Sequence, residues 1–246
     1  MLEFLREVYY VSWADLRFMR RNTLNIMISS LMSPLLYLVA FVLAVNSDDP
    51  ETYIAFVIPG IVALSSMTSS FSSTSTRMNV QRLYYRSFDE MMMCPLRPSA
   101  IVIGKSILGI IRSLISCSLI FVIGMFLTPN LFVNLLFVMS LLISCFSFSL
   151  LGEAAALLAK SHQSMATFNS LVILPMSFLC GTFFAVSTLP SVFQALLYLL
   201  PLTHSSSCIR AAALGTEFPW WSFCVMIAFC TTVFLLDYYL VVKRKI

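Results

Sequence analysis

The sequence predicts an all-α integral membrane protein with six transmembrane helices. Of its 246 residues, 59% are hydrophobic and only 11% are charged, whereas soluble domains carry about 25% charged residues. The apolar residues form long runs, and a membrane-spanning helix needs about 20 of them. Short loops rich in Lys and Arg alternate with loops that lack them, which is typical of a multi-pass protein.

The chain is expected to form a single transmembrane domain, residues 1–246, that begins with an amphipathic helix over residues 1–22. Apolar residues such as Leu5 and Tyr9 share one helical face, and basic residues such as Arg17 lie largely elsewhere. This pattern is typical of a helix at the membrane surface. Charges are scattered through the segment and no apolar core precedes a cleavage site, so we do not expect a signal peptide.

Six spans follow from the apolar runs. Their expected bounds are residues 23–45, 52–76, 99–127, 131–159, 165–186 and 218–242. Pro34 lies inside the first span and predicts a kink, whereas Pro59 with Gly60 predicts a bend or break in the second.

Hydroxyl side chains dominate the second half of the second span, where nearly every residue from Ser65 to Thr76 is Ser or Thr. Small residues of this kind allow a neighbouring helix to approach closely, and their hydroxyls can bond the carbonyls of their own helix. The same hydroxyls could instead provide a polar lining for a substrate path. The sequence leaves both interpretations open.

Two ionisable residues fall inside the predicted spans. Arg112 in the third span is expected either to face the protein interior or to reach the membrane interface. Glu153 lies near the inner end of the fourth span and is expected to face water or pair with Lys rather than to relay protons. We see no pair of intramembrane carboxylates that would indicate ion coupling.

Residues 81–98 form the longest polar interruption of the chain, and their surplus of Lys and Arg predicts the cytoplasmic side. Leu83, Phe88, Met91 and Met92 form an apolar stripe at roughly helical spacing, and Pro95 ends the predicted helix. A short amphipathic helix of this kind either docks against a partner or lies on the lipid headgroups.

Residues 187–217 neither span the membrane cleanly nor resemble a soluble loop. Two short apolar stretches are separated by Pro201-Leu-Thr-His and end at Gly215, and each is too short to cross. They predict a re-entrant helical hairpin in the outer leaflet. Arg210 in the second arm either bonds carbonyls at the break or pairs with Glu217, or it attracts an anionic head group of a lipid-like cargo.

The distribution of basic residues predicts the topology. Nearly all Lys and Arg fall in segments on one side of the predicted spans, whereas the opposite loops hold Arg210 with four acidic residues. Short cytoplasmic loops carry this excess of positive charge. Both termini are therefore expected in the cytoplasm.

Motifs for enzymatic chemistry are absent from the sequence. It contains no glycine-rich GxxxxGK[ST] loop, no HExxH and no GxSxG. His162 and His204 are placed on opposite membrane faces, and the seven Cys show no metal spacing. We therefore expect no enzyme activity and no metal site, and the energy for any transport would come from another chain.

Four segments, in order along the chain, resemble the membrane subunit of type-2 ABC exporters. Tyr53–Ala63 is similar to the opening of that family's second span, and Phe88–Lys105 is similar to its coupling segment. Phe178–Pro190 and Leu200–Gly215 together resemble its outer hairpin. The Pro-Leu-Thr-His sequence and the following Ile-Arg are most similar to the nodulation-type lipo-oligosaccharide and drug-export branch, and the extended Ser/Thr run departs from the pattern.

The resemblance implies a permease that moves a lipid-like, glycolipid, oligosaccharide or drug-like substrate outward by alternating access. Two copies, expected as a homodimer, would pair with two ABC ATPase subunits, which bind ATP and Mg, so this chain is expected to bind no cofactor. The complex would lie among the lipids of the inner or plasma membrane as a multi-pass protein, with no nucleic-acid partner.

The resemblance also assigns roles to individual residues. Coupling to the ATPase is expected at Phe88, Asp89, Glu90, Met91 and Met92. The first, second and fifth spans would line the translocation path, with candidates at Tyr37, Phe41, Phe56, Ser66, Ser70 and Phe178. The outer hairpin would form an exit lid that includes Pro201, His204 and Arg210. No residue is expected to be catalytic.

Two alternative functions come from other classes. An ion-coupled secondary transporter would need midplane charges or an inverted repeat with broken helices, and the sequence shows no convincing repeat. A non-transporting membrane scaffold or sensor would need neither. Co-purification with an ATPase chain would distinguish all three.

Overall fold

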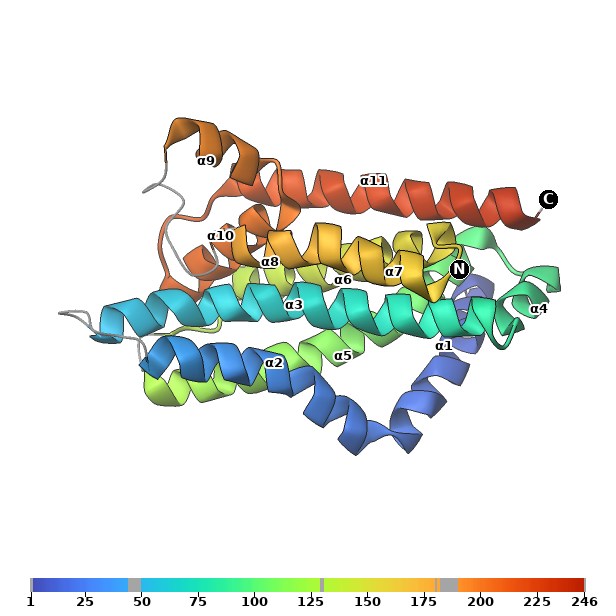
Figure 1. Cartoon of the computed structure of the whole chain (residues 1–246), viewed down its shortest axis with the longest axis horizontal. Helices are drawn as coiled ribbons and strands as arrows, with labels where there is room; N and C mark the ends of the chain where they lie inside the picture. Colours follow the sequence, from blue (N-terminus) through green and yellow to red (C-terminus); the bar gives the residue numbers. More distant parts are fainter. Residues whose placement is uncertain (1, 44–49, 129–130, 180, 182–189, 246) are drawn as a thin grey trace.

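The computed structural model describes residues 2–43, 50–128, 131–179, 181 and 190–245. These residues are helical or connect helices, and they contain no strand. The elements are α1 (Leu2–Arg21), α2 (Thr23–Leu43), α3 (Pro50–Leu83), α4 (Ser87–Met93), α5 (Pro98–Leu127), α6 (Leu135–Leu158), α7 (His162–Phe168), the π-helix η1 (Asn169–Ile173), α8 (Leu174–Leu179), α9 (Ser191–Tyr198), α10 (Pro201–Leu214) and α11 (Trp220–Lys245). Figure 1 shows the long helices side by side, with α1, α4 and the end of α11 at one end of the bundle and α9 at the other.

Four helices within the described residues are long and apolar enough to cross a membrane. They are Tyr53–Leu83, Pro98–Leu127, Leu135–Leu158 and Trp220–Arg244, and α2 contains a shorter apolar stretch at Ile28–Ala40. The chain is thus an all-α membrane protein, while the number of six spans stays a prediction. Residues 44–45 of the predicted first span and residues 180 and 182–186 of the predicted fifth span lie outside the described residues.

Helix α3 is the centre of the bundle, with α5 and α6 packed along it. Its apolar side chains, including Ile58, Ile61 and Met67, are almost fully buried. Glycine allows this close approach. A Cβ atom at Gly152 of α6 would lie 2.7 Å from the Phe71 carbonyl oxygen of α3. Pro59 does not break α3, which continues through it as one helix.

The predicted fifth span is divided into α7, η1 and α8. Pro175 has no N–H, so the carbonyl one turn earlier loses its helical hydrogen-bond partner. The wider π-helix from Asn169 to Ile173 directly precedes this proline, as π segments often do where the helical ladder is disturbed. Ser161 caps the start of α7 by accepting a hydrogen bond from the Ser164 N–H at 3.2 Å.

Helix α1 packs against α5 through one face and presents aromatic residues on the other. Val8, Val11 and Asp15 are buried, whereas Tyr9 and Trp13 are half exposed. The exposed aromatic face fits the predicted position at a membrane surface, because such rings favour the interface.

Helix α3 extends beyond the predicted end of its span at residue 76 and stops at Leu83. The chain turns at Arg86, whose φ of 53° is left-handed, and α4 begins at Ser87. Leu83 therefore belongs to α3, so the predicted single amphipathic segment consists of a helix end, a turn and a separate short helix. Arg82 anchors the end of α3 by donating to the Leu157 carbonyl of α6 at 2.9 Å.

The outer segment forms two short helices, but the break differs in position from the expectation. It falls at Leu199 and Leu200, and Pro201 begins α10. Proline suits the first turn of a helix, where its missing N–H has no partner to lose, so His204 lies inside α10 rather than in the break. Gly215 ends α10 with a φ of +68°.

Candidate functional site

A polar cavity of about 260 Å³ lies between α2, α3, α5 and the η1–α8 segment. Hydroxyl groups are the commonest polar groups in its wall. The lining residues are Ser29, Ser30, Ser33, Pro34, Tyr37, Thr68, Ser69, Ser72, Arg112, Asn169, Ile173, Leu174 and Ser177. A cavity of this size among membrane helices, lined by hydroxyls, can hold a polar group that the hydrocarbon would reject.

The hydroxyl groups of α3 divide between helix packing against α6 on one face and the walls of cavities on another, while a substrate path along them stays a prediction. Ser66 is fully buried and its hydroxyl lies 2.7 Å from that of Ser144 in α6. Thr74 pairs in the same way with Ser149 at 2.7 Å. On the opposite face, the cavities of this region take in hydroxyls spaced at helical intervals, such as Ser72.

Two further cavities continue the first one toward the α4 end. One of about 230 Å³ shares Ser72 and Asn169 with it. Another of about 240 Å³ shares Arg112 with it and is walled in part by Phe18 and Leu108. Polar and apolar compartments therefore adjoin along one face of α3.

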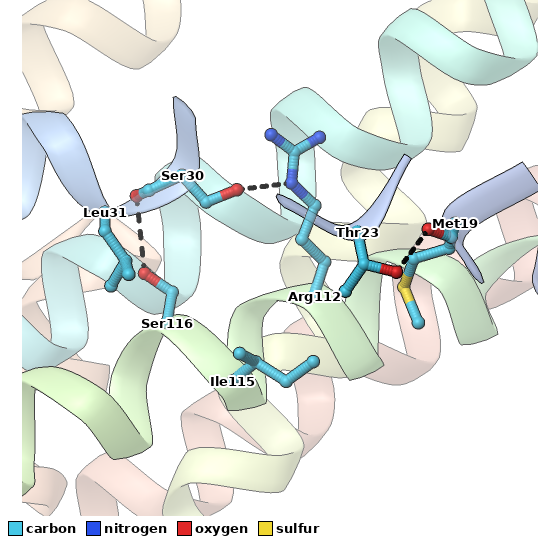
Figure 2. Close-up of a pocket in the computed structure, with 7 residues that line it drawn as sticks. All are labelled: Met19, Thr23, Ser30, Leu31, Arg112, Ile115 and Ser116. Atoms are coloured by element: carbon cyan, nitrogen blue, oxygen red, sulfur yellow. Dashed lines mark hydrogen bonds between the residues drawn. The ribbon is translucent and has the colours of Figure 1, made fainter. Parts of the chain in front are cut away.

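Arg112, halfway along α5, lines both the 260 Å³ cavity and the 240 Å³ cavity. Its Nε donates to the Ser30 hydroxyl and one terminal nitrogen donates to the Ser29 hydroxyl at 3.1 Å. Figure 2 shows the side chain leaving α5 toward Ser30 of α2, with Ser116 bonded to the same α2 turn. Of the two positions expected for this arginine, the structure shows the one that faces the protein interior.

A buried ionic cluster joins α1, α3 and α5 near the α4 end. Asp15 accepts from Arg77 at 2.8 Å, Gln81 at 2.7 Å and Lys105 at 2.9 Å, and Lys105 also donates to Gln81. Burial raises the pKa of the Asp15 carboxyl, but the charges and hydrogen bonds of Lys105 and Arg77 outweigh burial, and the pKa lies below its usual value. Asp15 is therefore ionised and holds three helices together.

The predicted coupling residues divide between two faces of α4. Phe88 and Met92 are buried in the chain's own core, whereas Asp89 and Glu90 are exposed and Met91 is half-buried. Met93, which was not among the predicted residues, is 87% exposed. The sequence pattern identified the helix correctly, but an apolar stripe does not tell whether its members pack inward or outward.

The exit-hairpin residues are tied to the rest of the chain. Arg210 donates to the carbonyls of Phe56 and Gly181, each at 3.1 Å, and its guanidinium stacks 3.7 Å from the Phe56 ring. His204 bonds the Tyr198 carbonyl at 2.8 Å across the break between α9 and α10. Arg210 was expected to bond carbonyls at the hairpin break, whereas the carbonyls that it bonds belong to Phe56 of α3 and to Gly181, outside that break.

The predicted path residues lie in different surroundings. Tyr37 lines the 260 Å³ cavity, whereas Ser66 and Ser70 are buried outside the cavities that the structure describes. Phe178 is 54% exposed on α8. The side chain of Phe41 lies outside the described part of the chain.

Two acidic residues differ from the expectations for the span interior. Glu153 of α6 is fully buried rather than facing water, and the nearby Lys105 bonds Asp15 instead. Asp237 of α11, which the sequence reading did not single out, is also fully buried and is an electrostatic neighbour of Glu153. Contrary to expectation, the membrane domain thus contains a pair of buried carboxyls, and their oxygens have no hydrogen-bond partner among the described residues.

Long apolar helices around a hydroxyl-lined cavity define the chain as a membrane transport protein. The profile of the ABC-2 type transporter family matches residues 6–214. The chain therefore belongs to this family, whose members are transport permeases, and it is a multi-pass membrane protein.

Two similar proteins support the assignment of the chain to this family. Nodulation protein J of Rhizobium meliloti (strain 1021) is 29% identical over 216 residues, which cover 84% of this chain and 79% of that protein. The inner membrane transport permease YadH of Escherichia coli (strain K12) is 25% identical over 197 residues, which cover 79% of this chain and 77% of that protein.

Proposed function

We propose that the chain is the membrane half of an ATP-driven exporter that moves a lipid-like, glycolipid or drug-like molecule outward through the cavities along α3. The observation that carries this proposal is the row of adjoining polar and apolar cavities between α2, α3 and α5. An amphipathic cargo needs a polar environment for one end and an apolar environment for the other at the same time. Membership of the ABC-2 family supports an ATPase partner, since the sequence contains no nucleotide-binding loop of its own.

The proposed docking site for the ATPase is the outer face of α4. Asp89, Glu90 and Met93 are exposed together on this short helix, while Phe88 and Met92 fix it to the core. Exposed ion pairs contribute only about 0–1 kcal/mol each, so the Met93 side chain should contribute most of the apolar contact.

We further expect a homodimer with α2 near the two-fold axis. Ile28, Met32, Leu36 and Val39 form an exposed apolar stripe along this helix, at the spacing of one helical face. Apolar side chains alone do not drive association in lipid. The dimer is therefore expected to gain its affinity from close packing at this stripe and from shared ATPase subunits.

The docking proposal is tested by co-purification of the permease with its ATPase subunit. The double variant Asp89→Lys with Glu90→Lys and the single variant Met93→Asp should each reduce ATPase recovery at least tenfold. Lys160→Glu, a charge reversal on another exposed residue, is the control and should retain it. Wild-type recovery with all three variants would eliminate α4 as the docking site.

The same preparations discriminate between classes of function. An exporter of the proposed kind transports only with ATP and its ATPase partner in the vesicle. Transport by the permease alone, driven by an ion gradient, would instead indicate a secondary carrier and would direct attention to Glu153 and Asp237. A scaffold would show neither activity.

A further inference from the structure

Among the residues that the structure describes, Arg112 is a cation without an acidic partner. The ion pairs found within the described residues do not include it, and its guanidinium donates hydrogen bonds to the hydroxyls of Ser29 and Ser30. Asp15, on the neighbouring helix α1, is already bonded to Arg77, Gln81 and Lys105.

The sequence of the surrounding helices explains this lack of an acid. Neither α2 nor α5 contains Asp or Glu, and the same holds for the segment from η1 through α8. The acid of α3 is Glu51, in its first turn, at the opposite end of that helix from α4. The elements that form the cavity thus place one guanidinium, and no counter-charge, against the hydroxyls of its wall.

This combination of groups is suited to an oxyanion. A guanidinium has five N–H donors in a planar fork, and it binds carboxylate, sulfate or phosphate oxygens through paired, charge-assisted hydrogen bonds. Ser69 lines the same cavity, and its hydroxyl can donate a further bond. A cation inside a membrane protein is costly unless it is paired, so an anion that enters the cavity supplies the missing partner.

One of the neighbouring cavities can hold the apolar part of the same molecule. The 240 Å³ cavity that shares Arg112 is walled in part by Phe18, Val80 and Leu108. The cavity in Figure 2, of about 20 Å³, also borders Arg112 and is bounded in part by the apolar side chains of Leu31 and Ile115. The 240 Å³ cavity is large enough for an acyl or aromatic chain whose charged end remains at the guanidinium, whereas the one in Figure 2 has room only for a water-sized group.

We propose that Arg112 and the hydroxyls beside it bind the oxyanion group of an anionic amphiphile. The inference rests on the proposed function only in taking this molecule to be the cargo. The binding itself requires just the cavity and its charge. A resident anionic lipid presents the same chemistry, so the test must separate the two sources.

Binding is measured on the full-length permease in nanodiscs of phosphatidylcholine, which supply no competing net negative charge. The probes are dodecyl phosphate and the uncharged dodecyl maltoside. The variant Arg112→Gln should weaken binding of dodecyl phosphate at least tenfold and leave binding of dodecyl maltoside within twofold. Arg112→Lys should fall between, because it keeps the charge and loses the fork.

Two further variants test whether a loss of binding comes from misfolding. Ser29→Ala with Ser30→Ala retains the cation and should weaken dodecyl phosphate binding severalfold. Arg17→Gln removes a charge from an exposed position of α1 and should change nothing. Equal binding of dodecyl phosphate by wild type and by folded Arg112→Gln would overturn the proposal, as would equal losses for both probes.

The complex with the ATPase then identifies the source of the anion. If the amphiphile is cargo, dodecyl phosphate raises ATP hydrolysis by wild type and not by Arg112→Gln. If it is a resident lipid, native mass spectrometry detects phosphatidylglycerol on wild type, less on the variant, and hydrolysis does not respond to the probe. Both results support the oxyanion site. ATP-driven transport of uncharged molecules without any anion binding would refute this inference while leaving the proposed function intact.

Discussion

Replacement of Asp15 by asparagine should destabilise the permease strongly, because this carboxylate is the centre of the cluster that joins α1, α3 and α5. The variant removes the charge that faces Lys105, which is 7% exposed, and so leaves a buried ammonium group without an anion. Removal of one partner of a buried pair costs about 3–5 kcal/mol. In a chain of this length each kcal/mol changes Tm by about 2–4 °C, so the loss should be about 6 °C or more.

The pH dependence of this effect follows from the lowered pKa of Asp15. A carboxyl whose pKa is lower in the folded than in the unfolded chain stabilises the fold fully above the unfolded value, about 3.9. That stabilisation is lost as pH falls through the folded pKa. The difference in Tm between wild type and Asp15→Asn should therefore be constant from pH 7 to pH 5 and should shrink only below about pH 4.

Thermal unfolding of the purified protein in detergent, followed by the fluorescence of its tryptophans, measures both effects. Arg97→Ala is the matched control, because it breaks only the more exposed pairs with Glu3 and Glu7, at 3.8 and 3.7 Å, worth about 0–1 kcal/mol. Asp15→Asn combined with Lys105→Met should recover part of the loss. A Tm for Asp15→Asn within about 1 °C of wild type, in the range of the exposed pairs, would refute the view that this cluster fixes α1.

Three further outcomes are expected. Gly152→Ala should cost about 1–3 kcal/mol by overpacking, because the new methyl group would meet the Phe71 carbonyl at 2.7 Å; a Tm equal to wild type would contradict the close contact of α3 and α6. Glu153→Gln or Asp237→Asn should raise Tm, since each removes a buried carboxyl without a hydrogen-bond partner in the described chain; a fall in Tm for both would show that these groups are paired in the membrane. Arg210→Lys should lower Tm by several degrees because Lys cannot both bond two carbonyls in a fork and stack on an aromatic ring; reduced export at unchanged Tm would favour a role in cargo binding instead.

The sequence predicted the helices well because their signals are local. Apolar runs mark the long helices, the amphipathic stretch around Met91 marks α4, and Gly215 marks the end of α10, whereas Pro201 was expected in the break and instead begins α10. Each signal involves neighbours within a few residues, so no knowledge of tertiary contacts is required.

The partners of polar residues could not be predicted, because they are distant in the sequence. Asp15 and Lys105 are 90 positions apart, and Glu153 meets Asp237 only through the packing of α6 against α11. The two faces of α4 are a similar case. Met92 and Met93 are adjacent and chemically identical, and only the position of α4 on the core decides that the first is buried and the second exposed.

Helix α3 is long and unbroken, so a tilt of the helix moves both of its ends. Its 34 residues extend about 50 Å, well beyond the roughly 30 Å of the hydrocarbon layer. The rigid contact of Phe71 with Gly152 is a natural fulcrum, with the connection to α4 on the short side and the Phe56 carbonyl held by Arg210 on the long side. Phe56 lies about 22 Å along the helix from Phe71, so a tilt of roughly 5° about that contact would displace Phe56 by about 2 Å. A small push at α4 is thus geometrically sufficient to shift the hairpin at the opposite end.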